Sequence, residues 1–136
     1  MKMKLPPHAA FHHDIRLIVW RPRGVLREKQ ISEVVEFIEK EEDRAEKPFN
    51  RFTDTSKLEA IDLDPQFVLR VSLHRRAVYA QRPAVKSAFY VTSEAVARIV
   101  QIHVLATDHS PLECAIFETL EDTAKWLGVP VDTLEM

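Results

Sequence analysis

The chain has 136 residues, of which 46% are hydrophobic and 29% are charged, and its formal net charge at pH 7 is −2. These values predict a single globular domain, residues 1–136, whose core needs neither disulfides nor a metal. Because acidic and basic residues are interspersed and nearly balanced, no global field attracts nucleic acid, and we expect none as a partner.

Cysteine and glycine usage narrow the functional classes further. Cys114 is the only cysteine, so no internal disulfide forms, and a reducing, cytoplasmic location is expected. The basic N-terminus leads into no apolar stretch typical of a secretory signal, and no apolar run is long enough to span a bilayer. The two glycines, Gly24 and Gly128, are too far apart to form a Gly-rich phosphate-binding loop.

The first third of the chain predicts a hairpin followed by a helix. Residues 8–13 and 15–20 are the expected strands, with Asp14 in the turn, and the second strand is rich in β-branched and aromatic residues. Residues 28–43 form the expected helix, because apolar residues recur there at helical spacing. These residues are Ile31, Val34, Val35 and Ile38.

The second third predicts a strand, a helix and another strand. A third strand is expected over residues 49–53. Asp64 and Pro65 mark a helix start, since aspartate caps free backbone N–H groups and proline suits the first helical position. This helix is expected to run to about Gln81, and a fourth strand is expected over residues 85–91.

The last third predicts a helix, a strand and a final helix. Thr92 or Ser93 caps the first of these helices, and the fifth strand covers residues 112–117. Thr119 opens the final helix, which stops at Gly128. After the N-terminal hairpin, strands and helices alternate. This order predicts an α/β fold: a mixed five-stranded sheet, mostly parallel after the hairpin, with the helices on one face.

Six segments resemble those of a known fold family. They are Trp20–Leu26, Phe49–Asp54, Ile61–Leu63, Arg75–Arg76, Pro83–Ala88 and Trp126–Pro130. With the element order, they resemble the STAS-like, or SpoIIAA-like, family, in particular its small uncharacterised bacterial members. The resemblance implies a β-α superhelix with helices on one side of the sheet.

The resemblance also bears on phosphorylation. Phosphorylatable members of the family carry Asp-Ser-Ser-Gly before the second helix, and the first serine accepts the phosphate. Here the matching stretch is Asp62-Leu63-Asp64-Pro65, in which Leu63 stands in the place of the acceptor and has no hydroxyl. The resemblance therefore implies the fold without this phosphoswitch. Thr55 and Ser56, in the preceding turn, are the nearby hydroxyls that a displaced switch would use.

No catalytic or metal site is predicted. Asp108-His109-Ser110 contains the residue types of a hydrolytic triad, but three consecutive loop residues do not meet as triad members do, and a turn is the better interpretation. His12 and His13 point to opposite faces of a strand, which disfavours a shared metal ion. Cys114 is expected to be a buried small hydrophobe with no base beside it.

Three candidate binding residues, all aspartates, are expected near the carboxyl end of the third strand, where open α/β sheets commonly place ligands, and three arginines are expected close enough to pair with them. These six residues are Arg51, Asp54, Asp62, Asp64, Arg75 and Arg76. Two interpretations stay open. The residues form an ion-pair network that fixes a loop to the second helix, or they form a site for an anion or a protein partner. The basic side of that helix, with Arg70, His74 and Arg82, is either a solvated surface or a second such site.

These features predict a non-catalytic STAS-like regulatory or protein-interaction module that needs no cofactor. A small-ligand binding domain, for a nucleotide, a lipid or another anion, is the alternative. A homodimer is also expected, because an open sheet face would expose large apolar side chains, unless residues 1–10 cover it. These side chains are Ile18, Trp20, Tyr90 and Phe117.

Overall fold

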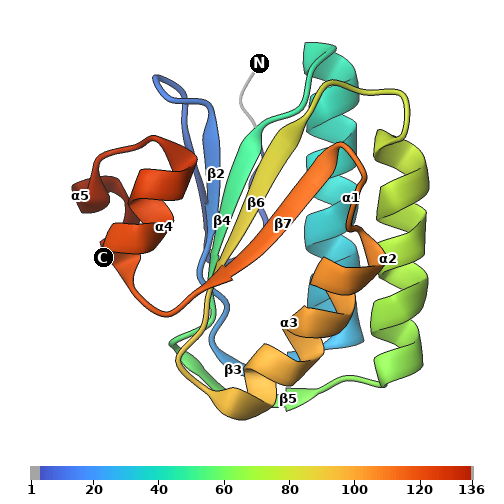
Figure 1. The fold of residues 1–136 in the computed structure, drawn as a ribbon, viewed down its shortest axis with the longest axis vertical. Coiled ribbons are helices and arrows are strands. Elements are labelled where there is room, and N and C mark those ends of the chain that lie inside the picture. The colour runs from blue at the N-terminus through green and yellow to red at the C-terminus, as the bar shows by residue number, and fades with distance from the viewer. Residues whose placement is uncertain (1–3, 136) are drawn as a thin grey trace.

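The computed structural model describes residues 4–135, and its centre is a five-stranded sheet (Figure 1). In order across the sheet, the strands are β1 (Ala9–His12), β2 (Leu17–Trp20), β4 (Asn50–Asp54), β6 (Val85–Tyr90) and β7 (Leu112–Phe117). β1 pairs antiparallel with β2, and every other neighbouring pair is parallel. The predicted mixed sheet, antiparallel only in its N-terminal hairpin, is confirmed.

Three long helices cover one face of this sheet (Figure 1). They are α1 (Glu28–Ala45), α2 (Pro65–Tyr79) and α3 (Glu94–Ala106). The predicted starts of α2 and α3 are confirmed: Asp64 Oδ1 accepts a hydrogen bond from Gln66 N at 2.9 Å, and the Ser93 hydroxyl accepts one from Val96 N at 3.4 Å. Each cap pairs a backbone N–H that would otherwise lack a partner in the first turn.

The C-terminal helices lie on the opposite face, and here the prediction of helices on one face is wrong for the last main helix. α4 (Leu120–Leu127) and α5 (Val131–Leu134) stand apart from α1–α3 in Figure 1, across the sheet. Each of α1–α3 joins two parallel strands, so right-handed crossovers hold them on one side. α4 follows the last strand and joins no further strand, so it is free to pack on the other side. Gly128, with φ of 73°, ends α4 as predicted.

A short second sheet was not predicted as strands. β3 (Gly24–Arg27) runs parallel to β5 (Leu58–Asp62), with Leu26 opposite Ile61. Two of the segments that carried the family resemblance thus pair with each other. β3 leads directly into α1, and β5 precedes α2, so this small sheet closes the end of the space between the helices and the main sheet.

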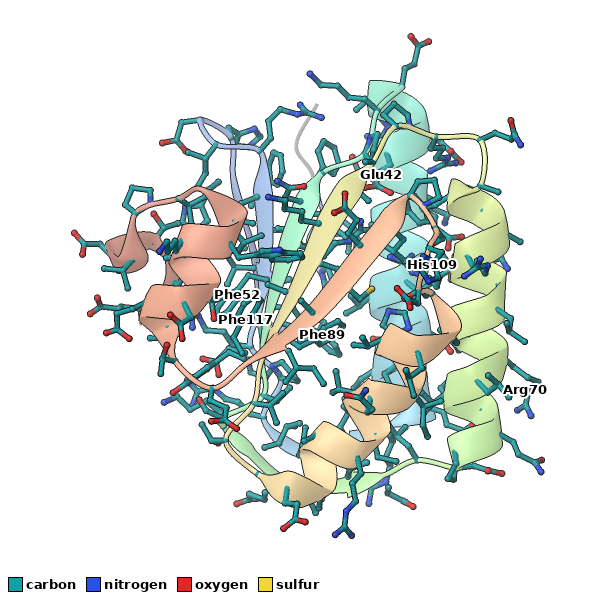
Figure 2. All side chains as sticks on the ribbon, viewed as in Figure 1. Glu42, Phe52, Arg70, Phe89, His109 and Phe117 are labelled. Carbon is teal, nitrogen blue, oxygen red and sulfur yellow. The ribbon has the colours of Figure 1, made fainter. Side chains whose placement is uncertain are left out.

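The core has a layer on each face of the main sheet. Ile18 and Trp20 pack with residues of α1, whereas Tyr90 and Phe117 pack in a cluster with α4 and α5. Figure 2 shows Phe52 and Phe117 on the α4 side of the sheet and Phe89 on the α3 side. The four side chains expected to form one exposed patch are therefore divided between two faces. The open face that motivated a homodimer is covered by the chain's own C-terminal helices.

Among residues 4–135, no helix combines the length and the apolar character needed to cross a bilayer.

Candidate functional site

A cavity of about 140 Å³ lies between the main sheet and helices α1–α3. Fifteen of its lining residues are apolar and seven are polar. The apolar wall comes mainly from the inward faces of the three helices. Its members on these helices are Ile31, Val34, Val35, Ile38, Phe67, Val68, Val71, Val96, Ile99 and Val100. The same helical spacing that predicted amphipathic helices therefore builds this wall.

The sheet contributes the floor of the cavity. Arg51 and Thr53 on β4 stand beside Ser87 and Phe89 on β6, because these strands pair in register with Arg51 opposite Ser87 and Thr53 opposite Phe89. Alternate residues of a strand face the same side, so all four point toward the helices. The floor therefore changes from charged and polar at Arg51 and Ser87 to aromatic at Phe89.

Arg51 is tied to a buried polar network. Its Nη2 donates to Tyr79 Oη at 2.6 Å, and the Tyr79 hydroxyl in turn donates to Glu42 Oε1. Glu42 is 2% exposed, accepts a hydrogen bond from Phe49 N at 2.7 Å, and lies 3.5 Å from Arg51 Nη2. Burial raises the pKa of Tyr79, which keeps its hydroxyl protonated and able to donate.

Arg75, on α2, is the second cation at this end of the cavity. It is 5% exposed, and its Nη1 donates to Glu39 Oε2 at 3.2 Å. Desolvation, followed by the nearby positive charge of Arg51, lowers the pKa of Arg75. Arg51 and Arg75 line the cavity, whereas their acidic partners Glu42 and Glu39 do not.

His103 on α3 completes the polar end. Its Nδ1 lies 2.8 Å from Ser72 Oγ, and its Nε2 lies 3.4 Å from Cys114 Sγ. The Ser72 hydroxyl also donates to Val68 O at 2.7 Å. A neutral ring protonated at Nδ1 gives both ring nitrogens a hydrogen-bond partner. Nδ1 then donates to the Ser72 hydroxyl oxygen, and Nε2 accepts from the Cys114 thiol.

The pKa directions argue against nucleophilic catalysis by Cys114. Desolvation, with the positive charges of Arg75 and Arg51, lowers the pKa of His103 to about 3. Burial raises the pKa of the Cys114 thiol. An activated thiol needs the opposite shift, toward a thiolate beside an imidazolium. At neutral pH the pair is a neutral thiol and a neutral imidazole.

The six candidate residues do not form one site. Arg51 and Arg75 reach the same cavity, but Asp54 pairs with Arg21 at 2.9 Å, and Asp62 is exposed and lies 3.6 Å from Arg27. Asp64 caps α2. Arg76 donates to the backbone oxygens of Ala106 and Asp108 at the end of α3. The acidic partners of Arg51 and Arg75 come from α1, which the sequence interpretation did not include.

The other sequence candidates have ordinary structural roles. His74 lies 3.2 Å from Glu39, Arg82 pairs with Asp43 at 2.5 Å, and Arg70 extends outward from α2 in Figure 2. The Asp108–Ser110 segment forms a turn, in which the Ser110 hydroxyl donates to Thr107 O at 2.5 Å. Within residues 4–135, no three His, Cys, Asp or Glu side chains are grouped as a metal site would require.

Sequence reasoning missed the polar residues that face inward. Ser72, His103 and Glu42 each occupy a position where the apolar stripe of α2, α3 or α1 predicts an apolar side chain. Ser72 is four residues after Val68, His103 three after Val100, and Glu42 four after Ile38. A polar residue inside such a stripe was the available signal, since a buried polar group needs a partner.

The comparisons with known proteins concern the fold. No protein-family model matches the sequence, and no curated protein matches it. A solved structure does match: an uncharacterised protein of the DUF3478 family, with a SpoIIAA-like fold, from Shewanella loihica. It is 16% identical, the match covers 88% of this chain and 90% of that one, and the TM-score is 0.56. This chain has a SpoIIAA-like fold. The predicted fold resemblance is thereby confirmed, and activity does not follow from fold.

Proposed function

We propose that the chain is a non-catalytic binding domain that holds a small, largely apolar ligand in the cavity beneath α1–α3. The observation that carries this proposal is the cavity itself, with fifteen apolar and seven polar lining residues. Well-packed cores leave few voids larger than a water molecule, so a natural apolar cavity of this size requires a reason. The sequence predicted either protein interaction or ligand binding. Ligand binding explains the cavity, whereas protein interaction alone does not.

The volume restricts the ligand. An apolar cavity of about 150 Å³ holds one benzene-sized molecule, whereas drug-sized and nucleotide-sized ligands need roughly 300 Å³ or more. A cavity of about 140 Å³ therefore favours a compact ligand with the bulk of a single ring or a short branched chain. A nucleotide and a long-chain lipid are both too large to be enclosed.

The two tryptophans provide a built-in test. Trp20 lines the cavity, whereas Trp126 packs against Phe117 on the α4 side of the sheet. In a titration with toluene followed by ¹H–¹⁵N NMR, the indole signal of Trp20 should shift and saturate, and that of Trp126 should stay in place. Val71→Phe, which fills the cavity, should abolish the Trp20 shift, and Leu105→Phe, on the exposed surface, should not. Absence of a saturable Trp20 shift in the unsubstituted chain would contradict the proposal.

A protein-interaction role is the second candidate, and one observation favours it. The outer surfaces of α2 and α3 expose three leucines: Leu69 at 43%, Leu73 at 50% and Leu105 at 65%. Exposed apolar side chains on adjoining helices are common at protein interfaces. If a second copy packs there, sedimentation equilibrium at micromolar concentration should give a dimer that Leu73→Asp dissociates. A 15.7 kDa monomer would exclude the homodimer.

A further inference from the structure

Arg51, which lines the polar end of the cavity, carries a hydrogen-bond donor that residues 4–135 leave unpaired. The Nε atom of Arg51 is buried and has no partner among the described residues, although the guanidinium's other nitrogens bond to Phe49 O and Tyr79 Oη. An unpaired buried donor costs about 1–3 kcal/mol, more when it is charged. Arg51 is 3% exposed and lines the cavity, so bulk water does not compensate for this loss.

The charges that face the cavity are positive. Arg51 and Arg75 are the charged residues of its lining, and the carboxylates that offset them, Glu42 and Glu39, belong to the network behind them. Burial is the main cause of the low pKa of His103, and the positive charges of Arg75 and Arg51 add to it. An anionic group beside the two guanidinium groups accepts charge-assisted hydrogen bonds, which are stronger than those a neutral ligand accepts.

The neighbouring groups suit a small anion. Ser87 is 5% exposed, faces the cavity, and lies opposite Arg51 across the β4–β6 pairing. A serine hydroxyl and an arginine N–H are both donors, so side chains of these types on adjacent strands can donate to the two oxygens of one carboxylate. A phosphate ester carries more charge and more acceptor oxygens than this set of donors pairs, and the cavity volume leaves little room for it.

We propose that the ligand is a small monocarboxylic acid whose apolar body fills the cavity and whose carboxylate is bound by Arg51, with Ser87 and Arg75 beside it. This inference rests on the proposed function, because it names the chemical class of the ligand for the same cavity. The apolar body lies against Phe89 and the inner faces of α1–α3. The carboxylate accepts from Arg51 Nε and occupies the positive end of the cavity.

The test compares three probes of similar bulk in the full chain at pH 7: benzoate, benzamide and toluene. Affinities come from the saturable shift of the Trp20 indole signal. Benzoate should bind at least about tenfold more tightly than benzamide, because one charge-assisted hydrogen bond is worth at least that factor. Arg51→Met should remove this preference while toluene still binds. Arg70→Met, at an exposed cation of α2, is the matched control and should leave it unchanged.

The outcomes separate the two proposals. If toluene binds but benzoate binds no better than benzamide, the carboxylate proposal is overturned and the apolar-ligand function stands. If none of the three probes binds, both proposals fail. A benzoate preference that persists in Arg51→Met would overturn the assignment to Arg51. Should Arg51→Met not fold, Arg51→Lys retains the charge without Nε, and an unchanged benzoate preference there would likewise overturn the assignment.

Discussion

Ser72 and His103 join α2 to α3 through a contact of 2.8 Å between Ser72 Oγ and His103 Nδ1, at the polar end of an otherwise apolar cavity. On its other side, His103 Nε2 accepts from the Cys114 thiol, and it can do so only while the imidazole is neutral. The protonation state of His103 is therefore linked to the packing of the two helices and to folding stability.

Acidification should destabilise the protein through His103. Its pKa in the folded chain is about 3, below the ordinary value of 6.5, so between these values the unfolded chain binds a proton that the folded chain does not. The contribution of neutral His103 to the free energy of unfolding is therefore complete above pH 6.5 and is lost as the pH falls toward 3. The expected decrease in the free energy of unfolding is at most about 1.4 kcal/mol per pH unit. Urea denaturation at pH 7, 6 and 5 measures it.

Two variants isolate this effect. His103→Gln removes the titration, so its free energy of unfolding should depend less steeply on pH than that of the unsubstituted chain. His109→Gln changes a side chain that is 89% exposed and should leave the pH dependence unchanged. Equal slopes for His103→Gln and the unsubstituted chain would show that His103 titrates normally in the folded state.

Tyr79→Phe should destabilise the fold by about 1–3 kcal/mol. The hydroxyl of this fully buried side chain bonds to both Arg51 and Glu42, and its loss leaves buried charged groups with fewer partners. Urea denaturation at pH 7 gives the difference. Tyr90→Phe removes a hydroxyl that makes no hydrogen bond within residues 4–135, so a loss below about 0.5 kcal/mol is expected there. Similar losses in both variants would mean that the network around Glu42 contributes nothing specific.

Asp64→Ala should reduce the free energy of unfolding by about 1 kcal/mol, as the loss of an N-cap does. The cap is the hydrogen bond from Gln66 N to Asp64 Oδ1. Asp62→Ala is the matched control, since its ion pair with Arg27 is exposed and should contribute less than about 1 kcal/mol. Thermal denaturation measures both. An unchanged melting temperature for Asp64→Ala would indicate that Asp64 serves contacts outside this chain.

Local signals predicted most of the fold. The apolar spacing of residues 28–43 and the capping residues Asp64, Ser93 and Thr119 set helix positions that the structure confirms, because these effects act within one or two turns. The side of the sheet on which α4 packs depends on long-range burial, which no local pattern encodes. β3 and β5 were missed for the same reason, since each is short and is defined by pairing with the other.

The candidate site was predicted only in part. Arg51 and Arg75 were named from sequence and do reach one cavity, but their expected partners, Asp54, Asp62 and Asp64, lie elsewhere. Proximity to the carboxyl end of a strand does not determine on which face a side chain lies. Arg51 and Asp54 are three residues apart on β4 and therefore face opposite sides of the sheet.

Phosphorylation should not occur between residues 58 and 70. This segment contains no serine, threonine or tyrosine, and Leu63, at the position that the family resemblance assigns to the acceptor, lines the cavity. The nearest hydroxyls are already hydrogen-bonded: Thr55 Oγ1 donates to Tyr90 O at 2.8 Å, and Ser56 Oγ donates to Asp54 Oδ1 at 2.6 Å. A phosphate on Ser56 would stand beside the Asp54 carboxylate, where like charges repel.

Incubation with ATP and a serine kinase of the anti-sigma type, followed by mass spectrometry of the peptides, should therefore show no labelling at Thr55 or Ser56. Ser56→Ala and Thr55→Val identify the acceptor if labelling occurs, and stoichiometric labelling that either one abolishes would show that the switch is retained at a displaced position.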